Sequence, residues 1–288
     1  MSLSFATDKT LAEFSTFGIG GPIAYFAEVT TIEEMREGIL FSVDQNLPLL
    51  VVGRGSNCLF DDAGFSGVVL HNKIDFCTWK EGDLQVYVGG GYNFSLLGVQ
   101  SARKDWSGLE FGSGIPGSVG GAVFMNAGAN GRETSASVVS VVYMDMEGNT
   151  REYRKEEIVF GYRFSSFQKK QGAIVAATFA FTKSPRARDK QIQMVERRIK
   201  TQPLKEKSIG CVFRNPETVS AGFLIEQCGL KGTREGGAKI SDLHANFIIN
   251  DEGATGVDVQ NLIKKIQSKV LKETGFQLQT EIWHITNG

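Results

Sequence analysis

The chain has 288 residues, 41% of them hydrophobic, which is enough to bury a sizeable core and more than one compact domain usually contains. Its 31 Lys and Arg residues are balanced by 32 Asp and Glu, so no net field draws it to nucleic acid or to an acidic membrane surface. We therefore expect a small-molecule partner, no nucleic-acid or membrane partner, and a monomer or weak oligomer.

The termini and the cysteines indicate the compartment. The N-terminal residues contain no basic stretch followed by an apolar one, and no apolar stretch is long enough to span a membrane. The four cysteines form no C-x-x-C pair and the three histidines are far apart, which gives no support for a metal site. We expect a cytoplasmic protein with reduced cysteines and no metal.

The first half of the chain is predicted to mix one helix with several strands. Thr30 or Thr31 can cap a helix over residues 31–46, and Glu33 and Glu34 suit its first turn. Short apolar runs separated by glycines predict strands at residues 49–53, 67–70, 84–88 and 137–144. This pattern favours an α+β fold.

The last third is more helical. A charged helix is predicted over residues 187–201, with Pro203 as its stop, and a second helix over residues 257–273, ended by Gly275. The second helix is expected to bury one stripe, made of Val259, Leu262, Ile263, Ile266, Val270 and Leu271. We place three domains at residues 1–72, 73–184 and 185–288.

A first glycine loop follows the strand at residues 49–53. Gly53 and Gly55 leave backbone N–H groups uncovered, an arrangement that can hold a pyrophosphate, although such a turn is a weak signal alone. A dinucleotide-binding βαβ motif does not fit here, because Cys58 occupies the position of the third glycine and the following residues do not begin a helix.

A second glycine loop spans residues 112–121 and formally contains G-x-G-x-x-G. It keeps a nicotinamide dehydrogenase open as an alternative, with Asp145 as the acidic ribose ligand, but this residue lies farther along the chain than the usual spacing of about 20 residues. The loop also suits a short helical turn that starts near Pro116 and directs its N–H groups at phosphate. Two such loops in one chain suit a dinucleotide.

These loops belong to a longer series of motifs that resembles the UDP-N-acetylenolpyruvoylglucosamine reductase family. The N-terminal motifs are FGIGG at 17–21, GRGSNCLF at 53–60, GLEFGSGIPGSVGG at 108–121 and MNAGA at 125–129. The C-terminal motifs are FGYRFSSF at 160–167, QP at 202–203, SIGCVFRNP at 208–216, AGFLIE at 221–226, GLKG at 229–232, SDLHANF at 241–247 and LQTE at 278–281. Their order and spacing agree along nearly the whole chain.

The resemblance implies a fold, a cofactor and a reaction. The fold is an α+β FAD-binding fold of the vanillyl-alcohol-oxidase (PCMH) type, with two FAD-binding subdomains and a C-terminal α+β substrate domain. The cofactor is non-covalent FAD, and NADPH is the electron donor. The reaction reduces UDP-N-acetylglucosamine enolpyruvate to UDP-N-acetylmuramate, in peptidoglycan precursor synthesis. The chain has no room after Phe167 for an extra tyrosine-bearing loop, so it resembles the shorter class of the family.

The resemblance also implies which residues form the site. The residues expected at the cofactor are Gly53, Arg54, Gly55, Ser56, Asn57, Cys58, Ile115, Pro116, Gly117, Ser118, Gly120, Gly121, Asn126, Ala127, Gly128 and Ile174. Those expected at the UDP-sugar substrate are Tyr162, Arg214, Asn215 and His244. Asn57 could equally be a turn former only. A solvated helix face explains most of the excess of Lys and Arg between Lys183 and Lys207, and part of this excess is expected to attract the UDP diphosphate.

Three residues are expected to carry the chemistry. Arg163 is the electrophile at the substrate carboxylate, Glu281 its polarising partner, and Cys211 the proton donor. The family usually has serine at position 211, but a thiol is a stronger acid than an alkanol, so proton donation remains reasonable. Two alternatives stay open: an FAD-linked oxidase of another small molecule, and a non-catalytic protein that binds a UDP-sugar. Neither needs this set of three residues.

Overall fold

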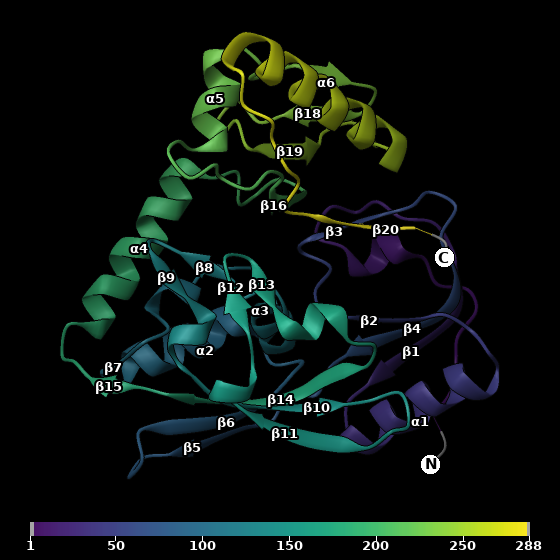
Figure 1. Ribbon diagram of the computed structural model, residues 1–288, viewed down its shortest axis with the longest axis vertical. Helices are drawn as coiled ribbons and strands as arrows, with labels where there is room; N and C mark the ends of the chain where they lie inside the picture. The colour runs from purple at the N-terminus through teal and green to yellow at the C-terminus, as the bar shows by residue number, and fades with distance from the viewer. Residues whose placement is uncertain (1–2, 287–288) are drawn as a thin grey trace. The chain divides into compact units, whose positions relative to one another are not determined.

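The computed structural model describes residues 3–286, which form two compact units (Figure 1). Unit 1 comprises residues 3–7, 25–54 and 67–197, and unit 2 comprises residues 8–24, 55–66 and 198–286. Each unit is built from segments that are far apart in the sequence. The division into three domains at residues 72 and 184 stays a prediction.

Unit 1 contains most of the strands. Its elements, some of which extend into unit 2 at one end, are β1 (Ile23–Val29), α1 (Ile32–Asp44), β2 (Leu49–Val52), β4 (Phe65–Asn72), β5 (Cys77–Lys80), β6 (Gln85–Gly89), α2 (Phe94–Arg103), β7 (Trp106–Ser107), η2 (Glu110–Gly112), α3 (Val119–Phe124), β8 (Gly128–Ala129), β9 (Arg132–Glu133), η3 (Thr134–Ala136), β10 (Val138–Met144), β11 (Thr150–Arg154), η4 (Lys155–Glu157), β12 (Phe160–Gly161), β13 (Phe164–Ser165), η5 (Ser166–Lys169), β14 (Ala173–Ala180), β15 (Thr182–Lys183) and α4 (Ala187–Thr201).

The centre of unit 1 is an antiparallel sheet in the order β11-β10-β14-β6-β5, and a smaller sheet has the order β1-β4-β2. Because side chains alternate along a strand, β10 contributes side chains to two hydrophobic cores. Val141 and Tyr143 lie in the core that α2 and α3 cover, while Val142 and Met144 face the core that contains α1 and the smaller sheet. Figure 1 shows α2 and α3 above β14 and β6. The central sheet is therefore covered on both faces.

The helix predicted at residues 31–46 is confirmed as α1. Thr31 caps it, since the Thr31 side chain accepts a hydrogen bond from the Glu34 backbone and the Glu34 side chain accepts one from Thr31 in return, at 3.1 Å each. The charged helix predicted at residues 187–201 is α4. The predicted strands at 49–53, 67–70, 84–88 and 137–144 overlap β2, β4, β6 and β10, with ends that differ by one residue in β2, β6 and β10.

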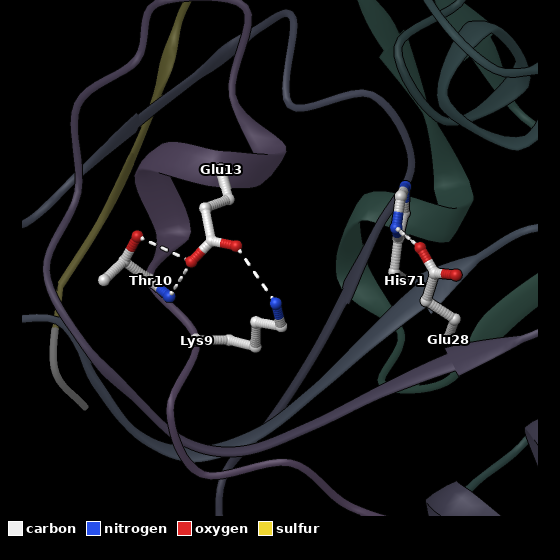
Figure 2. Close-up of polar contacts among 5 residues, drawn as sticks. All are labelled: Lys9, Thr10, Glu13, Glu28 and His71. Carbon is white, nitrogen blue, oxygen red and sulfur yellow. Dashed lines mark hydrogen bonds and ion pairs between the residues drawn. The ribbon is translucent and has the colours of Figure 1, made fainter.

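Unit 2 has an antiparallel sheet with helices packed on it. Its elements are η1 (Leu11–Phe14), β3 (Cys58–Phe60), β16 (Ser208–Cys211), α5 (Ala221–Gln227), β17 (Arg234–Glu235), β18 (Ala238–Ile240), β19 (Phe247–Asn250), α6 (Gly256–Thr274) and β20 (Trp283–Ile285). The sheet order is β16-β19-β18-β17, and β20 pairs in parallel with β3. A capping box fixes η1, where the Glu13 carboxylate accepts hydrogen bonds from Thr10 and Lys9 (Figure 2).

The predicted stripe of α6 is correct except at one residue. Val259, Leu262, Ile263, Ile266 and Val270 are buried in the core of unit 2, but Leu271 is 48% exposed. The helical period of 3.6 residues places position 271 away from the face that position 266 occupies. Gly275 ends the helix in the left-handed conformation, with φ of 75°.

Candidate active site

The two predicted glycine loops meet in unit 1. The first loop leads from β2 into β3 rather than into a helix, so it is not a dinucleotide-binding βαβ turn. A Cβ atom on Gly53 would lie 2.2 Å from the Ser118 hydroxyl oxygen, which belongs to the second loop. Only glycine permits this approach, and it joins two segments that are far apart in the sequence.

The second loop also contacts the strand that carries Ile174. The Gly120 N–H donates to the Gly90 carbonyl at 2.7 Å, and a Cβ on Gly120 would lie 3.3 Å from the Ile174 carbonyl oxygen. The buried Asn72 side chain donates to that carbonyl at 3.1 Å. The structure therefore brings Gly53, Ser118, Gly120 and Ile174 into one region of unit 1.

The short helical turn predicted near Pro116 is present, but it begins three residues later than Pro116. Helix α3 begins at Val119, and its cap is Ser118, whose hydroxyl accepts a hydrogen bond from the Gly121 N–H at 3.3 Å. A serine at the cap position satisfies an N–H group of the first turn, which a proline three residues before the helix cannot do. Pro116 is exposed in the preceding loop. The Gly117 carbonyl accepts from the Phe94 N–H at 3.0 Å.

Asn126, a predicted cofactor residue, has its side chain fully used inside the protein. It is completely buried, and its amide donates to the Glu133 carboxylate at 2.9 Å and to the Gly161 carbonyl at 2.8 Å. Its side-chain oxygen accepts from the Ser135 N–H at 3.0 Å. Its backbone has a positive φ of 43°, which asparagine tolerates better than other side chains. Asn126 thus anchors the β12–β13 hairpin.

That hairpin carries the predicted electrophile. Arg163 lies at its tip with φ of 56°, and strained backbone of this kind is concentrated at functional sites. Its guanidinium lies over the Tyr162 ring, 5.0 Å from the centroid. A Cβ on Gly128 would lie 3.2 Å from Arg163 Nη1, so the absence of a side chain at Gly128 makes room for the guanidinium. Unit 1 therefore places Arg163 beside a predicted cofactor segment.

Cys211 and Glu281 both belong to unit 2 and lie on neighbouring segments. Cys211 ends β16 and pairs with Phe247, and the next residue, Val212, accepts a hydrogen bond from the Glu281 N–H at 2.8 Å. The buried Asn246 side chain holds both backbone groups of Phe213, accepting from its N–H at 2.9 Å and donating to its carbonyl at 2.8 Å. These contacts fix the course of the chain at the predicted acid and directly after it.

Buried polar atoms accompany Cys211 in unit 2. Arg198 Nε, Gln202 Oε1 and Arg214 Nε are buried and have no hydrogen-bond partner among residues 3–286. Burial lowers the pKa of Arg198, and the charge of a Cys211 thiolate acts in the opposite direction, so the two side chains are within electrostatic range. Such unsatisfied groups are rare unless a ligand or water meets them. Gly210, directly before Cys211, has open space around its missing Cβ, with φ of 79°.

The other predicted substrate residues lie in both units. In unit 2, His244 Nδ1 accepts a hydrogen bond from the Asn246 N–H at 3.2 Å, and burial lowers the pKa of the imidazole, so the ring is neutral with its proton on Nε2. The Asn215 side-chain oxygen accepts from the Ala221 N–H at 3.0 Å, ahead of α5. Tyr162, in unit 1, is 47% exposed.

The rest of the first glycine loop lies in unit 2, except for Arg54, which is exposed in unit 1. A Cβ on Gly55 would lie 2.1 Å from the Phe14 carbonyl oxygen, and the Asn57 side chain donates to the Glu281 carbonyl at 3.3 Å. Burial raises the pKa of the Cys58 thiol to about 12, which makes this cysteine an inert packing residue. Ser56 lies half-buried between them.

The described residues contain no disulfide, no metal-binding cluster and no membrane-spanning helix. All four cysteines fall within residues 3–286, and none forms a disulfide. The same residues contain no cluster of His, Cys, Asp and Glu that could hold a metal ion. No helix in this described part of the chain is long and apolar enough to cross a membrane.

Comparison with known proteins decides the family. The UDP-N-acetylenolpyruvoylglucosamine reductase of Protochlamydia amoebophila is 52% identical over 281 residues, which cover 98% of this chain and 94% of the relative. The chain belongs to the UDP-N-acetylenolpyruvoylglucosamine reductase family. The reductase of Chlamydia muridarum is 49% identical over a stretch that covers 94% of this chain and 91% of that relative. The crystal structure of the Thermus caldophilus reductase matches with a TM-score of 0.85 and 34% identity, covering 98% of this chain and 99% of that one.

Two family models match separate parts of the chain. Residues 23–154 match an FAD binding domain, and residues 202–285 match the C-terminal domain of UDP-N-acetylenolpyruvoylglucosamine reductase. The predicted α+β FAD-binding fold is thereby confirmed. The prediction that the protein is an FAD-dependent oxidoreductase is confirmed as well. A nicotinamide dehydrogenase of the βαβ type is excluded, since the first loop runs into β3, the second follows the 3-10 helix η2 instead of a strand, and β10 pairs antiparallel with both of its neighbours.

The residues of unit 1 fit FAD. The close packing of Gly53 on Ser118 brings the two glycine loops together, so that both can border one dinucleotide, whose rings need apolar surface. Partly buried Ile115 and Ala127, on the second loop and beyond α3, pack against the core of unit 1 and can present such surface.

Sequence reasoning missed Arg198 and Gln202 as site candidates. The charged helix containing Arg198 was recognised, but its charge resembled that of an ordinary solvated helix face. Gln202 donates its backbone N–H to the Arg198 carbonyl at 2.8 Å, so the two residues lie together where α4 ends. The available signal was the Gln202-Pro203 motif, which closes a helix four residues after an arginine.

Proposed function

We propose that this protein is a cytoplasmic enzyme that uses NADPH to reduce UDP-N-acetylglucosamine enolpyruvate to UDP-N-acetylmuramate, in peptidoglycan precursor synthesis. The observation that carries the proposal is the environment of Cys211 in unit 2. A thiol at a strand end, beside the segment of Glu281 and within electrostatic range of Arg198, whose Nε is buried, suits a site that receives an anionic substrate and protonates it.

Arg163 and Glu281 would stabilise the charge that develops on the substrate. When bound, FAD supplies the hydride that attacks the methylene carbon of the enolpyruvyl ether. Negative charge then spreads toward the substrate carboxylate as an enolate. A guanidinium preorganised at this carboxylate stabilises the enolate more than the ground state, because the charge there grows during the step. The strained backbone and the stacking on Tyr162 support a fixed position for Arg163.

Cys211 would complete the reaction by donating its thiol proton to the α-carbon of the enolate. The new C–H bond forms as the S–H bond breaks, which leaves a thiolate to be reprotonated before the next turnover. A guanidinium close to the sulfur stabilises the thiolate product of this transfer, and Arg198 is the cation of unit 2 whose interaction with Cys211 supports that role.

The UDP portion would be bound by the cationic and polar groups of the C-terminal part. Arg214 has a buried Nε, and Gln202 has a buried side-chain oxygen. Neither atom has a hydrogen-bond partner among the described residues. A diphosphate or a uracil ring carries the acceptors and donors that these groups lack. The neutral His244 would offer its Nε2–H to the substrate.

The test is the absorption spectrum of the purified protein, combined with NADPH consumption measured with and without the enolpyruvyl substrate. The proposal expects a flavin spectrum and rapid NADPH oxidation only when the substrate is present, with one UDP-N-acetylmuramate formed per NADPH. Rapid oxidation with oxygen as the acceptor would instead identify an oxidase. UDP-sugar binding without turnover would identify a non-catalytic binding protein.

A further inference from the structure

A glutamine side chain ties the tip of the β12–β13 hairpin to the end of α3, which lies beside the hairpin in Figure 1. The Gln168 amide nitrogen donates to the Arg163 carbonyl at 3.1 Å and to the Phe124 carbonyl at 2.8 Å. Both partners are carbonyl oxygens, so the nitrogen of the amide, and not its oxygen, faces them. A third contact, 3.7 Å to the Met125 sulfur, is weak because a thioether is a poor acceptor. The two N–H groups of one side chain therefore join Arg163 to α3.

The position of Gln168 is itself fixed by its neighbours. Gln168 is half-buried and belongs to η5, directly after Phe167. The Phe167 side chain is 1% exposed and stacks on the Tyr143 ring, with the centroids 5.2 Å apart. The Lys170 N–H closes the turn by donating to the Phe167 carbonyl at 3.1 Å. Since packed aromatic side chains move little, the residue that follows Phe167 is a firm support.

Arg163 needs such a support because its backbone is left-handed, with φ of 56°. For a residue other than glycine this conformation is costly, and it persists only where the surrounding structure determines it. The Asn126 amide holds the other side of the tip, where it donates to the Gly161 carbonyl at 2.8 Å. The carbonyl groups that flank Tyr162 are therefore both held by side-chain amides.

We propose that Gln168 is a positioning residue for the reduction, because its bond to the Arg163 carbonyl keeps the left-handed turn and thereby the guanidinium at the substrate carboxylate. The opposite end of α3 is capped by Ser118, on which Gly53 of the first glycine loop packs. A bond from Gln168 to the last residue of α3 thus relates Arg163 to the cofactor loops. The inference rests on the proposed function, in which Arg163 stabilises the enolate.

The test replaces Gln168 with methionine, which has a similar length and no donor. Q168M removes the Gln168 bond to the Arg163 carbonyl, while the Phe124 carbonyl keeps a bond from the Ser165 hydroxyl at 2.7 Å. A misplaced guanidinium loses most when charge develops, so kcat should fall about tenfold or more, with less than about twofold change in KM for the enolpyruvyl substrate. In stopped flow, NADPH should reduce the flavin at the wild-type rate, and reoxidation by the enolpyruvyl substrate should be slow.

Two further variants separate positioning from a general structural role. S165A is the matched control, because it removes the other bond to the Phe124 carbonyl and leaves the Gln168 bond to Arg163 in place. Urea unfolding should show similar losses of stability in Q168M and S165A, while S165A keeps the higher kcat. The double variant R163M/Q168M should have the kcat of R163M alone, since Gln168 then has no guanidinium to position.

Three results would overturn the inference: a wild-type kcat in Q168M, equal losses of kcat in S165A and Q168M, or a double variant that is slower than R163M. The proposed function fails in a different way, through a wild-type rate in R163M or through a purified protein without reductase activity. If Q168M does not fold, Q168N decides, because its amide is one methylene shorter and cannot reach both carbonyls. A wild-type kcat in Q168N then contradicts the role of Gln168, and a lowered kcat that disappears in the R163M background supports it.

Discussion

Asn126 offers the sharpest test of how the fold supports the proposed site. Its buried side chain makes three hydrogen bonds, to Glu133, Gly161 and Ser135, and its backbone is left-handed. Replacing it with alanine removes the three bonds, at about 1 kcal/mol each. The left-handed backbone costs alanine about 1 kcal/mol more. N126A should therefore lose about 4 kcal/mol of unfolding free energy, and N126G, which avoids the backbone strain, about 3 kcal/mol.

Asn130 provides the matched control. It also has a positive φ, 54°, but it is exposed. N130A should lose only the strain contribution of about 1 kcal/mol, and N130G should stay near the wild type. Urea unfolding of the four FAD-saturated variants, with slopes compared, measures these differences. The reasoning fails if N126G lies within about 0.5 kcal/mol of the wild type, since a buried amide with three partners cannot be that dispensable.

The same substitution has a functional consequence. The Gly161 carbonyl that Asn126 holds belongs to the hairpin that carries Arg163. In N126G, assayed at a temperature where the protein is folded, turnover should fall more than FAD retention does. Equal losses of both would show that Asn126 acts through the cofactor instead, as the sequence motif had suggested.

Three further predictions concern the chemistry. R163M and E281Q should each lower kcat by about 10²–10³ with little loss of UDP-sugar binding, and a wild-type rate would remove that residue from the mechanism. Acid precipitation should leave free FAD in a yellow supernatant, whereas colour in the pellet or FMN in the supernatant would contradict non-covalent FAD. If the neutral Cys211 thiol is the acid, kcat falls as pH rises through the thiol pKa, and C211S should lose this alkaline limb. The flavin of C211A should still be reduced by NADPH but should not be reoxidised by the enolpyruvyl substrate. Reoxidation of the C211A flavin at the wild-type rate would refute the role of Cys211 as the acid.

The regular elements were predictable because their signals are local. Thr31 and the glutamate three residues later predict the start of α1. The apolar stripe and Gly275 predict α6 and its end. The errors had local causes as well. Pro116 suits a first helical position, but Ser118 is the better cap, and Leu271 was added to a stripe that the helical period excludes.

The candidate site was less predictable, because its assembly depends on contacts between distant segments. The sequence motifs identify Gly53 and Ser118 as loop residues but not as neighbours, which follows from their positions in unit 1. Arg198 and Gln202 resemble surface residues of a charged helix, and only the packing of unit 2 buries their polar atoms.

Three buried asparagines show why such contacts escape a sequence pattern. The Asn72 side chain donates to the Ile174 carbonyl and accepts from the Ile74 N–H, so it joins these two segments. Asn126 joins three segments of unit 1. Asn246 hydrogen-bonds both backbone groups of Phe213 in unit 2. A side-chain amide has a donor and an acceptor, so it can replace a missing strand neighbour on both counts, which an aspartate cannot do. In sequence, however, each asparagine is equally typical of a turn. The cofactor motif at Asn126 therefore marks a residue whose side chain builds the frame of the site, and its partners appear only when the chain has folded.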